Sequence, residues 1–167
     1  MKKTVYAAVF LLTGSIGAGT IDGYIMSCVS GDARNCDKVG LMYTEPRKGV
    51  DRNVSAGIAY FNKACRMQYA DGCFHMPKLY DRGKLVTRDK LNAGMYYRRA
   101  LRYYEKGCKN DNGRACLRLG LMYAESNGVK EDMKKANILF KRACELGNVD
   151  GCSVYDMLHK DKPFGMK

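Results

Sequence analysis

The chain has 167 residues, which is enough for one domain with a hydrophobic core or for a short array of repeats. Its 29 lysine and arginine residues outnumber its 17 aspartate and glutamate residues, and the charge of +12 favours acidic partners, anionic envelope polymers or nucleic acid without choosing among them. No stretch approaches the ~20 apolar residues that a transmembrane helix requires, so we predict a protein that does not span a membrane.

Residues 1–19 have the pattern of a bacterial secretory signal peptide. Lys2 and Lys3 precede an apolar run at 5–12, and small residues at 17–19 provide a cleavage site. We therefore predict a periplasmic or secreted protein. After loss of the two lysines the chain keeps 27 basic against 17 acidic residues, a charge of +10. Export argues against a nucleic-acid partner despite this charge.

A lipoprotein signal is the alternative interpretation of the same region. The stretch from Ile25 to Cys28 loosely resembles the motif in which the cysteine becomes a lipid anchor. Asp22 interrupts the apolar character before this cysteine, and Cys28 also belongs to the spacing pattern described next. Anchoring at Cys28 is therefore the minor hypothesis.

The 8 cysteines divide into pairs with one constant spacing. The two members of each pair are 8 positions apart: Cys28 and Cys36, Cys65 and Cys73, Cys108 and Cys116, Cys144 and Cys152. This register predicts that each cysteine forms a disulfide with the one 8 residues away, because an exported chain meets an oxidising compartment. A zinc site would need closer ligand spacing, and a redox site would need a C-x-x-C motif, so we predict no metal and no cofactor.

The same cysteines define a repeat. The intervals between first cysteines are 37 (28 to 65), 43 (65 to 108) and 36 (108 to 144), a period typical of helical solenoids. Gly40-Leu41-Met42-Tyr43 returns as Gly120-Leu121-Met122-Tyr123, in the same position relative to the cysteines. We predict an all-α solenoid of αα-hairpins, cross-linked by four disulfides, over residues 20–160, with a basic tail at 161–167.

The first full unit covers about residues 33–65 and follows a short helix at 21–28. Pro46 and Gly49 separate its two helices. Each helix has an apolar stripe, formed by Val39, Met42 and Tyr43 in the first and by Ala56, Tyr60 and Phe61 in the second. Gly40 lies mid-helix, where glycine costs about 1 kcal/mol relative to alanine, so we expect the neighbouring helix to approach closely there.

The second unit departs from the pattern in sequence and in length. Pro77 stands where the other units have glycine, so we expect the helix from Asp71 to be kinked or broken there. His75 is interpreted as a helix-face residue and not as a ligand. The unit's extra residues are placed at the start of its second helix, from Thr87 to Cys108.

The long helix of the second unit has two distinct faces. Ala93, Tyr97, Ala100 and Tyr104 form its core stripe. Tyr96, Arg99, Tyr103 and Lys106 line an adjacent face, where the tyrosines either stack on a ligand or pack against a neighbouring helix.

The third unit is regular, and a closing helix follows it. Apolar residues again recur at helical spacing in both helices: Leu119, Met122 and Tyr123, then Ala136, Leu139, Phe140 and Ala143. We expect the closing helix at 153–159, after which the basic tail ends the array with a polar cap.

Residues 28–152 resemble the Sel-like repeats, and in particular the disulfide-rich branch known as the Helicobacter cysteine-rich proteins. The C-x7-C pairs, the G-L-M-Y motif and the K-A-C motif carry the resemblance. It implies an exported α-solenoid. Some members of that family are described as weak β-lactamases or penicillin-binding proteins, and others as adaptors that bind proteins or envelope components.

The resemblance also suggests binding residues. By analogy with tetratricopeptide repeats, the first helix of each hairpin lines the concave surface. The candidate groove residues are Arg34, Asp37 and Leu41 in the first unit, Phe74, Lys78 and Asp81 in the second, and Arg114, Leu117 and Leu121 in the third. The face of Tyr96, Arg99 and Tyr103 is a further candidate.

We therefore expect an interaction module that binds a protein, a peptide or a peptidoglycan fragment, as a monomer or within a larger envelope assembly. The alternative is a weak β-lactamase or penicillin-binding protein. The sequence has no Ser-x-x-Lys motif, and Thr87-Arg88-Asp89-Lys90 only imitates one, so we expect binding rather than catalysis.

Overall fold

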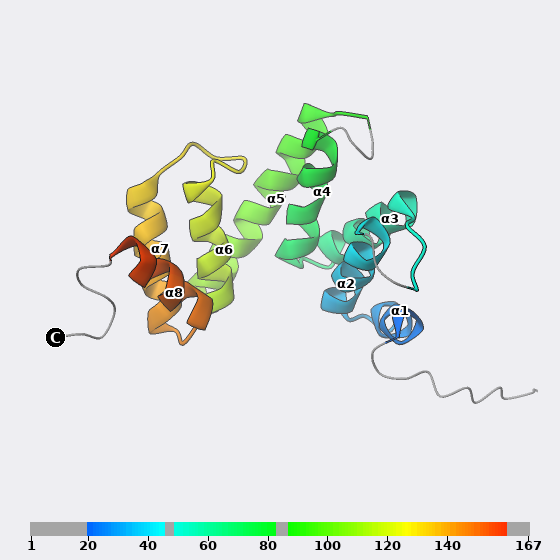
Figure 1. Cartoon of the computed structure of the whole chain (residues 1–167), viewed down its shortest axis with the longest axis horizontal. Helices are drawn as coiled ribbons and strands as arrows, with labels where there is room; N and C mark the ends of the chain where they lie inside the picture. The colour runs from blue at the N-terminus through cyan, green and yellow to red at the C-terminus, as the bar shows by residue number, and fades with distance from the viewer. Residues whose placement is uncertain (1–19, 46–48, 83–86, 160–167) are drawn as a thin grey trace, which may run out of the picture.

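The computed structural model describes residues 20–45, 49–82 and 87–159, which form an array of helices (Figure 1). These helices are α1 (Ile21–Val29), α2 (Ala33–Thr44), α3 (Val54–Arg66), α4 (Ala70–Arg82), α5 (Lys90–Lys109), α6 (Gly113–Ala124), α7 (Met133–Glu145) and α8 (Val149–Leu158). The predicted signal peptide, basic tail and side chain of Asp81 lie outside the described residues.

The helices stack in chain order from α1 at one end to α7 and α8 at the other (Figure 1). The pairs α2–α3, α4–α5 and α6–α7 are the hairpins, and each helix also packs against the next helix in the chain. In addition, α2 contacts α4 and α6 contacts α8. The predicted all-α hairpin solenoid is confirmed.

The four disulfides connect successive hairpins in the pairing that the repeat register predicts. Each bridge joins the end of one helix to the first turns of the next, across a short turn. The third residue after the first cysteine has a positive φ in every turn: Gly31, Gln68, Asp111 and Gly147. One backbone conformation is therefore repeated four times, and this explains the constant cysteine spacing.

Close helix contact at the repeat glycines is confirmed. A Cβ atom on Gly40 would lie 2.5 Å from the ring of Phe61, and one on Gly120 would lie 2.6 Å from the ring of Phe140. Both phenylalanines are almost completely buried. The glycines are therefore required by packing, which offsets their cost within a helix.

Of the two expectations for Pro77, a break is wrong, because α4 is continuous from Ala70 to Arg82 with Pro77 inside it, and a kink stays a prediction. A proline in a helix interior costs about 3 kcal/mol. Packing offsets this cost, because α4 contacts α2, α3 and α5, and its residues Met76, Pro77 and Leu79 are buried.

Two predicted helix starts need correction. The N-cap of α5 is Asp89 and not Thr87, because the Asp89 carboxylate accepts hydrogen bonds from the backbone N–H groups of Leu91 and Asn92. The closing helix α8 begins at Val149, before the 153 expected, because Asn148 caps it. The insertion itself lies in α5, which has 20 residues against 13 in α3 and 13 in α7.

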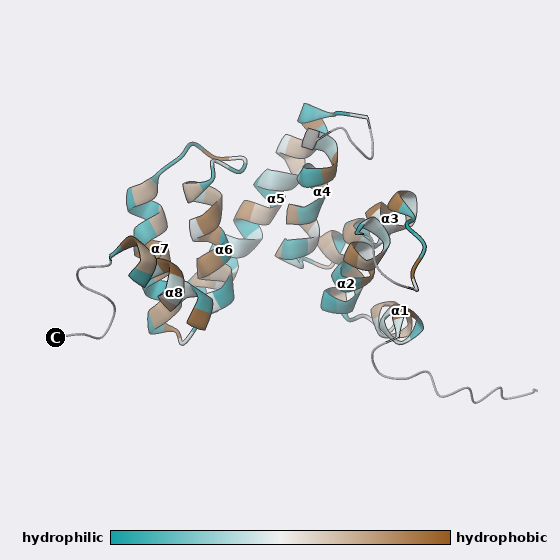
Figure 2. Ribbon diagram, in the orientation of Figure 1, coloured by the Kyte–Doolittle hydropathy of each residue, from teal (hydrophilic) through white to brown (hydrophobic). Residues whose placement is uncertain are grey.

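The buried apolar residues form clusters that follow one another along the array, and hydrophobic and hydrophilic residues alternate along each helix (Figure 2). The largest cluster runs from the end of α3 through α7, whereas the cluster between α1, α2 and α3 has Cys28, Cys36 and Ala64 as its buried members among the described residues. None of the described helices is long and apolar enough to cross a membrane.

Candidate functional site

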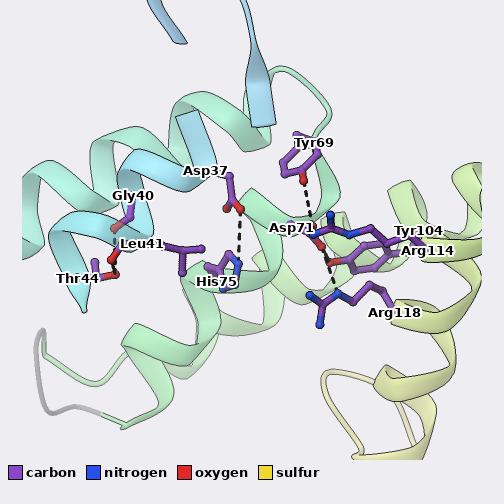
Figure 3. A network of polar contacts seen from close by, with 10 residues as sticks. All are labelled: Asp37, Gly40, Leu41, Thr44, Tyr69, Asp71, His75, Tyr104, Arg114 and Arg118. Atoms are coloured by element: carbon purple, nitrogen blue, oxygen red, sulfur yellow. Dashed lines mark hydrogen bonds and ion pairs between the residues drawn. The ribbon is translucent and has the colours of Figure 1, made fainter. Parts of the chain in front are cut away.

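A buried carboxylate, Asp71, is the centre of a polar cluster formed by α4, α5 and α6 (Figure 3). Asp71 lies in the first turn of α4, and its side chain is 6% exposed. It accepts hydrogen bonds from the hydroxyl groups of Tyr69, at 3.1 Å, and Tyr104. From α6, Arg114 Nη2 lies 2.6 Å from Asp71 Oδ2, and Arg118 Nε lies 3.7 Å from Oδ1. We call these five residues the Asp71 cluster.

Electrostatics keep Asp71 ionised. Burial alone would raise the pKa of this carboxyl, but the hydrogen bond from Tyr104 and the charges of Arg114 and Arg118 outweigh it and hold the pKa below its usual range. One negative charge thus faces two guanidinium groups, whose side chains are 53% and 38% exposed. The cluster therefore presents a net positive charge to solvent.

A second carboxyl, Asp37 of α2, lies beside His75 of α4, with 3.7 Å between Asp37 Oδ2 and His75 Nε2 (Figure 3). Burial raises the pKa of Asp37 to about 7, and the negative charge of Asp71 adds to this effect. Burial also lowers the pKa of His75 to about 4. Asp37 Oδ1 is buried and has no hydrogen-bond partner among the described residues.

Two hollows meet at Arg114. The first, of about 210 Å³, is bordered by Arg34, Tyr69, Asp71 and Arg114 together with Gly107 and Asn112 at the junction of α5 and α6. The second, of about 440 Å³, lies between α6 and α8 and has an apolar wall. It is bordered by Arg114, Leu117, Arg118, Leu121, Asn148, Asp150 and Val154. We call the two hollows together the Arg114 groove.

The structure brings several predicted groove residues together. Arg34 and Arg114 border the first hollow, Leu117 borders the second, and Asp37 lies beside the Asp71 cluster. Tyr103 of α5 also borders the first hollow.

Other candidates lie elsewhere. Phe74 is a core residue that packs against Tyr104, and the Lys78 ammonium lies 4.8 Å from the centre of the Phe74 ring. Tyr96 hydrogen-bonds Asn62 of α3, and with Arg99 it borders a separate hollow on α5. Tyr96 therefore packs against a neighbouring helix, as one of the two sequence interpretations held.

Sequence reasoning did not select Asp71, His75 or Arg118. The repeat register contained the signal for Asp71, because Asp71 stands two positions before the second cysteine of its pair, as Arg34 and Arg114 do. His75 is a helix-face residue as interpreted, but its side chain is only 21% exposed and faces Asp37. Within the described residues, no group of histidine, cysteine and acidic side chains could hold a metal ion.

Comparisons with known proteins identify the repeat. The Sel1 repeat profile matches residues 36–69, 67–112 and 113–148, which correspond to the three hairpins. No significant match was found among curated proteins. A Sel1 repeat protein from Oxalobacter formigenes has a similar structure, with a TM-score of 0.55 and 23% identity over 82% of this chain and 53% of that one. The chain thus spans about half the length of the Oxalobacter protein.

Two further solved structures are similar. Helicobacter pylori cysteine rich protein B gives a TM-score of 0.48 and 27% identity over 83% of this chain and 99% of that one. A protective antigen of uropathogenic Escherichia coli gives a TM-score of 0.45 and 20% identity over 84% of this chain and 36% of that one. Because the repeat profile covers residues 36–148 and its three matches fall on successive helix hairpins, the chain belongs to the Sel1 repeat family.

Proposed function

We propose that the protein is an exported interaction module whose Arg114 groove binds an acidic segment of a protein partner. Sel1 repeats generally mediate protein interactions, and this supports the general role. The four disulfides support an extracytoplasmic location, because such bonds persist in oxidising compartments.

One observation carries the proposal: a buried, ionised Asp71 anchors an exposed arginine, Arg114, at the point where two hollows meet. A guanidinium group has five N–H donors in a fixed plane, so the contact with Asp71 leaves donors for a ligand carboxylate. Because Asp71 fixes the side chain, less conformational entropy is lost when a ligand binds. Arg34, at the other side of the first hollow, adds a second cation.

The second hollow indicates which kind of ligand side chain would lie beside the ligand's acidic group. Leu117, Leu121 and Val154 form its apolar wall, and Arg118 lies at its border. A peptide that alternates acidic and apolar side chains would place a carboxylate near Arg114 and an apolar side chain against this wall. A peptidoglycan fragment also carries carboxylates, but its sugars would not use the apolar wall in the same way.

The weak β-lactamase hypothesis is not proposed. Among the described residues, the groove offers arginine, tyrosine and aspartate side chains, and no arrangement there favours an activated nucleophile.

The test is a binding titration with a fluorescent peptide that alternates glutamate and leucine, and with the same peptide carrying glutamine for glutamate. The glutamate peptide should bind at least about tenfold more tightly, which corresponds to about 1.4 kcal/mol. Arg114→Gln should remove most of this preference. Arg142→Gln is the matched control, because Arg142 is exposed and pairs with Asp111 outside the groove.

Three results would contradict the proposal: equal binding of both peptides, equal loss in both variants, or binding of neither peptide. A purified peptidoglycan fragment is tested in parallel. If the fragment bound and both peptides did not, the ligand would be the envelope polymer. Arg114→Lys keeps the charge but not the planar donor group, and it should bind with intermediate affinity.

A further inference from the structure

The outward side of α5 carries one continuous stripe of exposed residues. Leu91, Met95, Arg98, Arg102, Lys106 and Lys109 follow one another at steps of three or four. Such spacing places them on one line along the helix, about 27 Å long. The opposite side, with Ala93, Tyr97, Ala100 and Tyr104, is buried. We call the exposed stripe the α5 outer face.

The two ends of this face differ in chemistry. The end of the face near the start of α5 is apolar, because Leu91 is 85% exposed and Met95 is 50% exposed. The rest is basic and has no acidic member. Arg98, Arg102, Lys106 and Lys109 form no ion pair within the part of the chain that the structure describes. Glu105, which is half-buried, is the nearest acidic residue on α5.

A hollow of about 590 Å³ lies at the middle of α5, separate from the Arg114 groove. Arginine, aliphatic and tyrosine side chains border it together: Met95, Tyr96, Arg98, Arg99, Leu101 and Arg102. Guanidinium groups bind phosphate oxygens through paired N–H donors, and methionine and leucine contact methylene groups. The combination suits a ligand that is a phosphate at one end and a hydrocarbon at the other.

We propose that the α5 outer face docks on the surface of a membrane that contains anionic phospholipid. The basic residues would contact headgroup phosphates, and Leu91 and Met95 would enter the boundary between headgroups and acyl chains. A nucleic acid or an acidic protein would satisfy the charges but gives no role to an exposed leucine beside them. A straight stripe on a protruding helix also fits a flat partner.

The docking is independent of the Arg114 groove. The buried side of α5 packs against α4 and α6, the helices that supply Asp71 and Arg114. The α5 outer face points away from them, so a membrane there leaves the groove open to its own ligand.

The test is co-sedimentation with vesicles, using oxidised protein purified after export from an expressing bacterium. The protein should sediment with vesicles of phosphatidylcholine and phosphatidylglycerol, and not with phosphatidylcholine alone. The double variant Arg98→Gln with Arg102→Gln removes two cations and should weaken binding to the vesicles roughly 25-fold, because each cation contributes a factor of about 5. Lys130→Gln with Lys134→Gln removes the same charge from exposed positions outside the face and should have a much smaller effect.

The apolar contribution needs its own pair of variants. Leu91→Ser with Met95→Ser should weaken binding while leaving its dependence on salt unchanged. Val149→Ser with Met157→Ser alters exposed apolar residues of α8, which are 76% and 66% exposed, and should bind as the unaltered protein does. Thermal melting of each variant confirms that it is folded.

Specific results would overturn the proposal. Equal losses in the two charge variants would mean that only the overall charge matters. Unchanged binding after loss of Leu91 and Met95 would exclude insertion. Release of the protein from vesicles by polyglutamate or by duplex DNA at equal charge concentration would assign the face to an acidic macromolecule. Equal binding to uncharged vesicles would exclude phosphate recognition.

Discussion

The buried pair of Asp37 and His75 predicts an unusual relation between pH and stability. In the folded protein the pKa of Asp37 is about 7 and that of His75 is about 4, so the pair carries one proton, on Asp37, between these values. In the unfolded chain the two groups also carry one proton between about pH 4 and pH 6.5, on the histidine. Unfolding therefore moves the proton and changes the number bound very little, so the pair contributes almost no pH dependence in this range.

Replacing one residue of the pair should expose the pH dependence that the other residue contributes to the free energy of unfolding. In His75→Gln the folded-state pKa of Asp37 stays raised, because burial and Asp71 cause the shift. The folded state then binds more protons than the unfolded state, so the stabilising contribution is complete below about pH 4 and is lost as the pH rises to about 7. A shift of about 3 pKa units corresponds to at most about 4 kcal/mol over this window.

In Asp37→Asn the free energy of unfolding should change with pH in the opposite direction. Burial keeps the pKa of His75 lowered, and Asp37 is not among the charges that shift it. The unfolded state then binds more protons, so the contribution is complete above about pH 6.5 and is lost as the pH falls to about 4. A shift of about 2.5 units corresponds to at most about 3 kcal/mol.

The assay is urea unfolding at intervals between pH 4.5 and pH 6.5, with each variant compared to the unaltered protein so that all other titrating groups cancel. The free energy of unfolding, relative to that protein, should fall with rising pH in His75→Gln and rise in Asp37→Asn, each by about 1.4 kcal/mol per pH unit at most. The double variant should again follow the unaltered protein. Curves for both single variants that run parallel to the curve of the unaltered protein would refute the reasoning, because they would show that neither group has a shifted pKa.

Three further substitutions test the packing. Tyr104→Phe removes a buried hydrogen bond to the charged Asp71 and should cost about 1.5–3 kcal/mol by urea unfolding, and an unchanged value would mean that the bond is not formed. Gly120→Ala should lower the melting temperature because its Cβ would meet the Phe140 ring at 2.6 Å, whereas Gly94→Ala, with only a side-chain atom at 3.6 Å, should raise it; a rise in both would contradict the packing. Replacing both cysteines of the α1–α2 bridge by serine should cost roughly 2.5 kcal/mol and speed amide exchange in α1 and α2 before α6 and α7, and uniform exchange would show that the array unfolds as one unit.

The fold could be predicted from the sequence because its signals are local and repeated. The cysteine spacing of 8 reflects one turn conformation with a positive φ at its third residue, which each turn forms from its own few residues. The sequence alone does not fix the start of α5, because Thr87 and Asp89 are both residue types that cap helices and stand two positions apart. Pro77 misled the prediction because its cost is local, whereas the packing that offsets it comes from three other helices.

The Asp71 cluster could be predicted only in part. The repeat register indicates that Arg34, Asp71 and Arg114 occupy equivalent positions on neighbouring helices. It does not indicate which of them pair, because the bonds of Asp71 to Tyr104 and Arg114 span 33 and 43 residues. The raised pKa of Asp37 depends on burial between two helices, and sequence spacing carries no information about burial of that kind.

The core of the irregular second unit accounts for the position of the Arg114 groove. Each unit has an aromatic residue four positions before the first cysteine of the next pair. In the first and third units this residue is Phe61 and Phe140, and each packs on a glycine. The second unit has Pro77 in place of the glycine and Tyr104 in place of the phenylalanine. A buried tyrosine needs a partner for its hydroxyl group.

Asp71 is that partner, and its charge in turn holds Arg114 and Arg118 of the third unit. A substitution in the core of one repeat thus positions the cations of the next. Tyr104→Phe should weaken binding of the glutamate peptide as well as stability, because Asp71 would lose the hydrogen bond that fixes its carboxylate beside Arg114. Gly120→Ala, which alters packing outside the Asp71 cluster, should reduce stability while leaving peptide affinity almost unchanged. If the two variants bound the glutamate peptide with equal affinity, the core of the second unit would have no influence on the groove.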